Sequence, residues 1–168
     1  MSNKFKNHNF NKFVYSTLLL LTLISCLFAF IGERQSTRKL TERIDRHLVE
    51  QIMNQQQITV GRAIKNEDNV FVMATKRHIV TGDKIKTLKK ILLNDKNYTF
   101  DLTKKCLFAP EAVFQFQNDE QSSLMINLFC NQIKFIDGDK SIILDYDPVA
   151  EEFNAFCRDI LEHLDKEE

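Results

Sequence analysis

The sequence predicts an α+β protein: an N-terminal transmembrane helix, then a helix, a β-hairpin, a helix, an antiparallel β-meander and a C-terminal helix packed on one sheet. Three observations support this fold class. Residues 13–31 are apolar and uncharged. Short β-branched or Phe-rich stretches follow, several with a two-residue alternation. Between and around them, apolar residues recur every third or fourth position, as in amphipathic helices. Such a mixture is typical of helices packed on one face of an antiparallel sheet.

Composition shifts divide the chain into four parts. Residues 1–12 form a polar tail, 13–31 a transmembrane helix or signal anchor, 33–57 a juxtamembrane helix, and 58–168 a small α+β domain. The whole chain holds only two prolines and four glycines. This scarcity disfavours extended disorder in the domain.

Residues 13–31 allow two interpretations. At about 1.5 Å per residue, a helix of this length covers roughly 28 Å, close to the ~30 Å hydrocarbon core of a bilayer. The sequence Leu23-Ile24-Ser25-Cys26 also fits a bacterial lipobox, in which Cys26 is lipidated after cleavage. The apolar run continues past Cys26. This continuation favours a retained single-pass helix.

The charges on either side of this run bear on location and on partners. Lys4, Lys6 and Lys12 make the N-terminal flank basic, and a short basic tail favours a cytoplasmic N-terminus. We therefore expect residues 33–168 on the extracytoplasmic side of a bacterial membrane. With those three lysines set aside, 20 of the 23 basic residues face 23 acidic ones. This balance lacks the basic excess of a nucleic-acid-binding protein.

The juxtamembrane segment carries one narrow apolar stripe. Leu40, Ile44, Leu48 and Ile52 recur at every fourth position. The stripe predicts a helix that lies on the domain behind it. A narrow stripe also suits a coiled-coil seam, which would make a homodimer.

The first half of the domain reads as a hairpin followed by a helix. Residues 58–64 and 70–74 are β-branched and apolar, separated by a polar turn at 66–69. Thr81-Gly82-Asp83 then opens a helix to about residue 93, with Thr81 or Asp83 as its cap. Its expected buried face consists of Ile85, Leu88, Ile91 and Leu92.

The second half reads as a meander and a closing helix. A strand at 112–117 buries Phe114 and Phe116, and a turn follows at 118–121. In residues 124–136 one apolar set lies at even-numbered positions from 124 to 130, and Ile133 and Phe135 lie at odd-numbered positions. This change of face near Asn131-Gln132 predicts a bulge or break. Asp137-Gly138 turns the chain into a strand at 141–146. Asp147 as N-cap and Pro148 open the last helix, whose expected stripe is Val149, Phe153, Phe156, Cys157, Ile160 and Leu164.

Residues with catalytic or metal-binding chemistry are sparse. The four cysteines contain no C-x-x-C motif. A zinc site would need Cys106, Cys130, Cys157 and His78, which include no tight pair. A Cys106–His78 pair is the one nucleophilic arrangement to consider. Asp137, Asp139 and Asp145 are interpreted as polar residues of a hairpin, and Cys157 as a core thiol. We therefore expect no enzyme activity, no metal and no cofactor.

Residues 84–164 resemble a group of uncharacterised bacterial envelope proteins and lipoproteins. The shared pieces are Cys106-Leu107-Phe108-Ala109-Pro110, Phe114-Gln115-Phe116 and a strand containing Leu128-Phe129-Cys130-Asn131-Gln132. In that group a second Cys often precedes the strand Cys, whereas this chain has Asn127 and Leu128 there. The resemblance implies an envelope location and no assigned activity.

Cys106 and Cys130 both belong to this segment, and we predict that they form a disulfide. Pairing the strands about the turn at 118–121 places residue 106 roughly opposite 133, within a few residues of Cys130. A loop of this length gives roughly 3.5 kcal/mol in the chain-entropy model, and the bond needs an oxidising compartment. Two ordinary core thiols are the alternative.

These features favour a membrane-anchored envelope protein with a small non-catalytic interaction domain that binds an unknown protein partner. One alternative is a lipoprotein anchored through Cys26. The other is a small envelope enzyme that uses Cys106 and His78.

Overall fold

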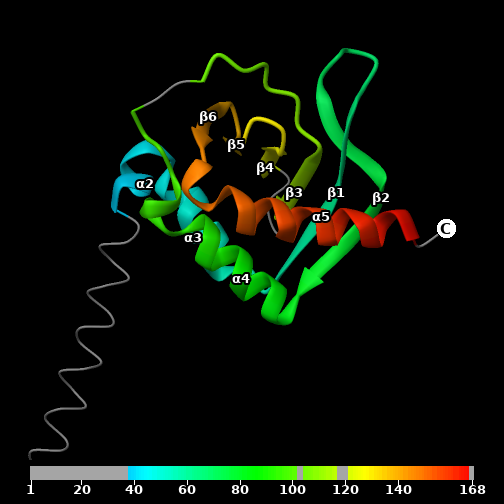
Figure 1. Ribbon diagram of the computed structural model, residues 1–168, viewed down its shortest axis with the longest axis horizontal. Coiled ribbons are helices and arrows are strands. Elements are labelled where there is room, and N and C mark those ends of the chain that lie inside the picture. Colours follow the sequence, from blue (N-terminus) through cyan, green and yellow to red (C-terminus); the bar gives the residue numbers. More distant parts are fainter. Residues whose placement is uncertain (1–37, 102–103, 117–120, 167–168) are drawn as a thin grey trace, which may run out of the picture. The chain divides into compact units, whose positions relative to one another are not determined.

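The computed structural model describes residues 38–101, 104–116 and 121–166. They build one six-stranded antiparallel sheet in the order β2-β1-β3-β4-β5-β6. All of them belong to one compact unit, residues 37–168. The α+β class and the antiparallel meander are therefore confirmed (Figure 1).

The elements follow the predicted order of helix, hairpin, helix, meander and helix. Their bounds are α2 Arg38–Arg43, α3 Arg46–Asn54, β1 Gln57–Lys65, β2 Phe71–Thr81, α4 Gly82–Leu92, η1 Asp95–Asn97, β3 Ala112–Phe116, β4 Ser122–Asn127, β5 Gln132–Asp137, β6 Lys140–Asp145, η2 Asp147–Val149 and α5 Ala150–Lys166.

Both predictions about membrane attachment fall outside the described residues. The transmembrane helix at 13–31 and the lipidation site Cys26 precede residue 38, and most of the predicted turn at 118–121 is outside them as well. No helix within the described ranges has the length and apolar character needed to cross a bilayer.

The prediction of a single helix over residues 33–57 is wrong in one respect. The described part of this range, from residue 38, forms two helices, α2 and α3. The chain leaves helical geometry at Ile44 and Asp45, and the Asp45 carboxylate accepts a hydrogen bond from the His47 N–H at the start of α3. An aspartate that caps a new helix competes with continuing the old one. Asp95 likewise accepts from the N–H groups of Lys39 and Leu40, at 2.8 and 3.0 Å.

The apolar stripe itself behaves as the first interpretation predicts. Leu40, Ile44, Leu48 and Ile52 are all buried in the core of the domain, none more than 5% exposed. A coiled-coil seam built from the same stripe would have to withdraw these side chains from the core. The stripe is therefore an intramolecular packing surface.

The hairpin is longer than predicted, because β2 continues to Thr81 instead of ending near residue 74. The second half of β2 lacks the apolar alternation of a strand because it contains Lys76, Arg77 and His78. Charged residues of this kind are common on an edge strand. The register shifts between Gly61 and Ala63. A Cβ added to Gly61 would lie 2.6 Å from Cγ of Met73, so any larger residue here would force the Met73 side chain to move.

The predicted break near Asn131 is a chain reversal. β4 ends at Asn127, β5 begins at Gln132, and the two strands pair with each other. Asn131 has a φ of 52°, in the left-handed region that asparagine tolerates. This turn explains the change of parity. Asp147 is not the cap of a regular helix, because a 3-10 turn, η2, precedes α5.

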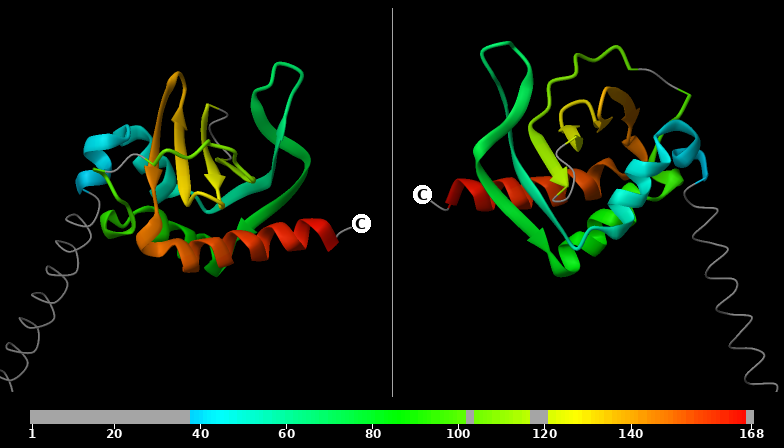
Figure 2. Two further views of the ribbon diagram at one scale, coloured as in Figure 1. Left: turned by 45° about the horizontal axis from the view of Figure 1, so that its top comes forward. Right: turned by 180° about the vertical axis from the view of Figure 1, so that it is seen from behind.

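The core lies between one face of the sheet and the helices. Figure 2 shows α4 and α5 on the same side of the strands. Phe153, Cys157, Ile160 and Leu164 of the predicted α5 stripe are buried, whereas Val149 and Phe156 are only partly covered. The predicted buried face of α4 is confirmed in full. Thr81 occupies the N-cap position of α4 without a side-chain capping bond.

Candidate functional site

Cys106 and Cys130 face each other at disulfide distance. Their Cα atoms are 6.3 Å apart across a sequence separation of 24, within the range that a disulfide spans. Cys106 lies in the irregular segment before β3, and Cys130 lies in the turn between β4 and β5. Figure 1 shows that segment arching over the end of the sheet. The observed pair Ala112↔Ile126 differs by one residue from the register on which the prediction relied.

We call residues 104–110 together with the turn 128–131 the disulfide corner. It displays two apolar side chains, Leu107 at 86% and Phe129 at 89% exposure. These are the most exposed large hydrophobic residues in the described part of the chain. Where exposed apolar side chains form a patch, they often mark a contact site for a partner.

Asn127 joins the two segments of the disulfide corner. Its Nδ2 donates to the Leu107 carbonyl at 3.1 Å, and its Oδ1 accepts from the Cys130 N–H at 3.0 Å. The Leu128 N–H donates to the Glu111 carboxylate at 2.7 Å. The backbone around Leu107 and Phe129 is therefore held by these hydrogen bonds as well as by the Cys106–Cys130 pair.

Lys104 and Asp147 attach the disulfide corner to the start of α5. Lys104 Nζ donates to the Cys130 carbonyl at 2.8 Å and to the Asp147 carboxylate. Asn131 Nδ2 donates to the same carboxylate at 3.0 Å. These two hydrogen bonds, the one from Lys104 foremost, hold the pKa of Asp147 below its usual value.

A second polar layer continues the attachment into α5. Asn154 Nδ2 donates to Asn131 Oδ1 at 2.9 Å, and the Tyr146 hydroxyl donates to Asn154 Oδ1 at 2.8 Å. Tyr146 is only 1% exposed, and burial raises the pKa of its hydroxyl. Hydrogen bonds of half-buried side chains and of the buried Tyr146 thus connect the disulfide corner to α5.

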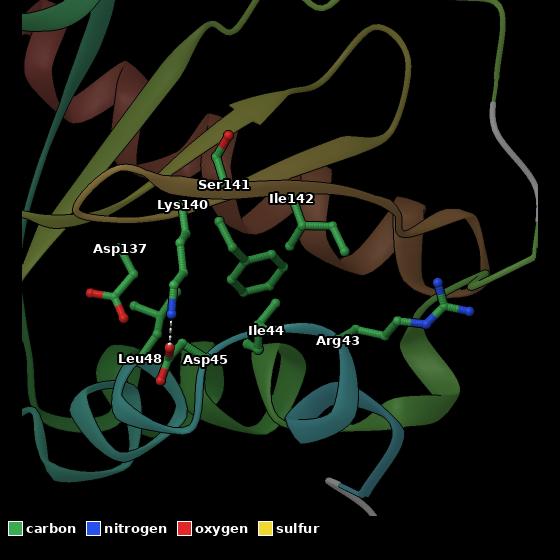
Figure 3. A pocket seen from close by; sticks show the side chains of 9 residues that line it. Arg43, Ile44, Asp45, Leu48, Asp137, Lys140, Ser141 and Ile142 are labelled. Atoms are coloured by element: carbon green, nitrogen blue, oxygen red, sulfur yellow. Dashed lines mark hydrogen bonds and ion pairs between the residues drawn. The ribbon is translucent and has the colours of Figure 1, made fainter.

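A separate hollow of about 250 Å³ lies where β6 meets the α2–α3 junction (Figure 3). Lys140 reaches from β6 to Asp45 at 2.8 Å beside it. Its apolar lining consists of Ile44, Leu48, Phe135 and Ile142. Four described charged residues line it: Arg43, Asp45, Asp137 and Lys140. Asp45 pairs with Lys140, Arg43 pairs with Asp101, and Asp137 contacts His47. None of these four charges is therefore left without a partner for a ligand to bind.

Within the lining of this hollow, Asp137 accepts a hydrogen bond from the Ser122 hydroxyl at 2.8 Å and lies 3.3 Å from Nδ1 of His47. The carboxylate stands between the hydroxyl and the imidazole. In a Ser-His-Asp triad the imidazole stands between the other two groups. This cluster is therefore not arranged to activate Ser122 as a nucleophile.

The structure does not bring Cys106 and His78 together. The sulfur of Cys106 faces Cys130, and the His78 ring lies beside His163 with 6.3 Å between ring centroids. Cys157 is fully buried, and burial raises the pKa of its thiol, as expected for an inert core cysteine. No group of three or more His, Cys, Asp or Glu residues within the described ranges could hold a metal ion.

The sequence analysis missed Leu107 and Phe129 as exposed residues. Phe129 has the parity opposite to the apolar set at 124, 126, 128 and 130, which was a usable signal. Leu107 lies in an irregular segment without periodicity, so nothing in its pattern distinguished it from a core residue.

No family model, no curated protein and no solved structure matches this chain. The geometry of the disulfide corner is therefore the basis for a functional conclusion.

Proposed function

We propose that this protein is a membrane-anchored envelope protein whose small domain is a non-catalytic interaction module. Residues 13–31 are its single-pass anchor, with the N-terminus in the cytoplasm and the domain outside it. The uncharged apolar run supports the anchor. The cysteine pair at disulfide distance suits an oxidising compartment. The module binds a protein partner through the disulfide corner.

The exposure of Leu107 and Phe129 carries this proposal. Covering apolar surface is worth about 25 cal/mol per Å², so two nearly complete apolar side chains offer a partner a useful contact. Their backbone is already fixed by Asn127 and by the cysteine pair. A contact site that is rigid before binding loses less conformational entropy when the partner arrives.

The alternatives differ in how well the geometry supports them. Anchoring through Cys26 would leave the disulfide corner unchanged, so the lipoprotein alternative concerns only attachment. An enzyme that uses Cys106 and His78 would need these side chains close together, and they have other neighbours. A homodimer through the juxtamembrane stripe would need the buried residues Leu40 and Leu48.

Site-specific photo-cross-linking in cells tests the contact site. The cross-linker p-benzoylphenylalanine replaces Phe129 or Leu107 in the full-length protein. Matched control positions are Ile79 and Val70 on the β1–β2 hairpin, which are 53% and 55% exposed. We expect a discrete protein adduct at 107 and 129 and none at the controls. Equal adduct patterns at all four positions, or no adduct at the disulfide corner, would contradict the proposal.

A further inference from the structure

Each exposed side chain of the disulfide corner is the sequence neighbour of one of its cysteines. Leu107 directly follows Cys106, and Phe129 directly precedes Cys130. The two Cα atoms of the cysteine pair are 6.3 Å apart. The disulfide is therefore the direct covalent link between the two pieces of chain that carry the apolar contact residues.

The segment that carries Leu107 has main-chain hydrogen bonds at its two ends. Before it, the Thr99 N–H donates to the Asp145 carbonyl at 2.8 Å. After it, the Glu111 N–H donates to the Ile126 carbonyl at 2.9 Å. No backbone–backbone hydrogen bond is found for the described residues between these two points. Between its ends, the position of this segment therefore depends on side chains and on the disulfide.

Two polar side chains assist the disulfide in holding this segment. Asn127 donates to the Leu107 carbonyl, and Lys104 donates to the Cys130 carbonyl and to Asp147. When such hydrogen bonds break, water replaces them, so each contributes little to the net free energy. Ordering an irregular segment, in contrast, costs conformational entropy at every residue. Once the disulfide opens, these bonds alone do not fix the position of Leu107.

The disulfide lies away from the helical core. Ile126 is fully buried in that core. Its neighbour Asn127 points to the opposite face of β4, because successive side chains of a strand alternate. The segment that is bonded to Asn127 is therefore on the face of the sheet away from the core cluster. Opening the disulfide should release this segment and leave the sheet and the helices folded.

The two sulfur atoms differ in access. Cys106 is half-buried, whereas Cys130 is only 6% exposed, so a thiolate from solution approaches the Cys106 sulfur. Lys105 precedes Cys106 and is exposed. Its positive charge attracts an approaching thiolate.

Building on the proposed function, we propose that the Cys106–Cys130 disulfide is a redox switch that controls partner binding. The oxidised protein holds Leu107 and Phe129 together and binds. A dithiol reductant opens the bond, and the partner is released.

The exchange proceeds in two steps. A thiolate of the dithiol attacks Sγ of Cys106 and forms a mixed disulfide, while Cys130 leaves as a thiolate and takes a proton from water. The second thiol of the dithiol then loses its proton and attacks its own sulfur in the mixed disulfide. Cys106 leaves as a thiolate and is protonated in turn. The protein gains two thiols, and the dithiol becomes a disulfide.

Photo-cross-linking from position 129 of the full-length protein, in isolated native membranes, tests the switch with dithiothreitol as the dithiol. The adduct yield should fall about tenfold on reduction, because losing one well-placed contact residue weakens binding by roughly that factor. Reoxidation should restore it. The double variant Cys106→Ser, Cys130→Ser should give the low yield with and without dithiothreitol. The matched variant Cys157→Ser, which alters the free core thiol, should respond as the native protein does.

Hydrogen exchange of the full chain in detergent tests the switch without the partner. In the reduced protein the amides of Leu128 and Cys130, which donate to Glu111 and Asn127, should exchange faster. The amides of β4 that pair with β5 should keep their rates. Unchanged exchange at Leu128 and Cys130 would overturn the switch. Faster exchange throughout the sheet would overturn it as well, because reduction would then unfold the domain.

The cross-linking outcomes separate this inference from the proposed function. Equal adduct yields before and after reduction overturn the switch and leave the contact site standing. A double variant that cross-links as well as the oxidised native protein has the same consequence, because dithiothreitol would then act on the partner. Absence of any adduct from position 129 of the oxidised protein overturns both proposals.

Discussion

Asp145 and Gln132 lie directly opposite each other on β6 and β5, both buried. Both carboxylate oxygens of Asp145 and Oε1 of Gln132 are without a hydrogen-bond partner among the described residues. Three neighbouring buried acceptors without a donor are costly, since each forfeits its hydrogen bonds to water. This pair is the least satisfied place in the described sheet.

Asp145→Asn should therefore stabilise the protein. The new amide carries an N–H group, from which Gln132 Oε1 can accept a hydrogen bond. The gain should be about 1–3 kcal/mol, measured as a rise in the melting temperature of the full chain in detergent. Asp139→Asn, at an exposed position of the turn between β5 and β6, should leave the melting temperature unchanged. A lower melting temperature for Asp145→Asn would show that a donor or cation satisfies this carboxylate in solution.

Cys106 and Cys130 should be oxidised in the native protein. Maleimide added to the denatured, unreduced chain should miss both of them, and reduction should add two labels. Cys130→Ser should lower the free energy of unfolding by about 3.5 kcal/mol in the chain-entropy model. Labelling of both thiols before reduction would contradict the prediction. Cys157 provides the internal control, because it is free and becomes reactive on unfolding.

Phe153 and Phe156 should differ in their contribution to stability, although both belong to the predicted stripe of α5. Phe153 is 1% exposed and packs edge-on against Tyr146 with 4.9 Å between ring centroids. Phe153→Ala should cost about 3–5 kcal/mol. Phe156 is only partly buried, so Phe156→Ala should cost clearly less. Chemical denaturation of the two variants gives the comparison, and equal losses would contradict it.

The ion pair Lys104–Asp147 should make the stability sensitive to acid. The folded state lowers the pKa of Asp147. The carboxylate therefore contributes stability that is present above its unfolded pKa of about 3.9 and is lost as pH falls through the lower folded value. The difference in melting temperature between the native protein and Asp147→Asn should shrink as pH is lowered below about 4. A constant difference down to pH 2 would contradict this account.

Residues 13–31 should hold the protein in the membrane. The full chain should stay in the membrane fraction after a carbonate wash, and Cys26→Ala should behave identically. Palmitate labelling that disappears in Cys26→Ala, together with cleavage before that residue, would instead establish the lipoprotein alternative.

The order of the elements could be predicted because most of them keep the hydrophobic periodicity typical of a helix or a strand. Every expected buried residue of α4 is buried, and so are Phe114 and Phe116 of β3. The predictions failed where polar residues interrupt the hydrophobic periodicity. Asp45 divides the juxtamembrane helix by capping α3, and Lys76 to His78 mask the second half of β2.

The candidate site was predictable only in part. Strand register was enough to bring Cys106 near Cys130, because antiparallel pairing fixes which residues lie opposite each other. The hydrogen bonds of Asn127 with Leu107 and Cys130 depend on an irregular segment without periodicity. The sequence pattern likewise missed η2, which shifts the start of α5 from Asp147 to Ala150.

Asp95 accepts hydrogen bonds from the first turn of α2 and so attaches this helix to the domain. This attachment also limits how far the domain can move from the proposed anchor. The first described helix, α2, begins at Arg38, and seven residue steps separate Arg38 from the end of the proposed anchor at residue 31. At no more than about 3.6 Å per residue, these steps reach at most about 25 Å. If residues 13–31 anchor the chain as proposed, the domain searches a thin layer above the bilayer, where its local concentration is high. A partner in that layer can be bound with modest affinity, whereas one that stands farther from the membrane surface is out of reach.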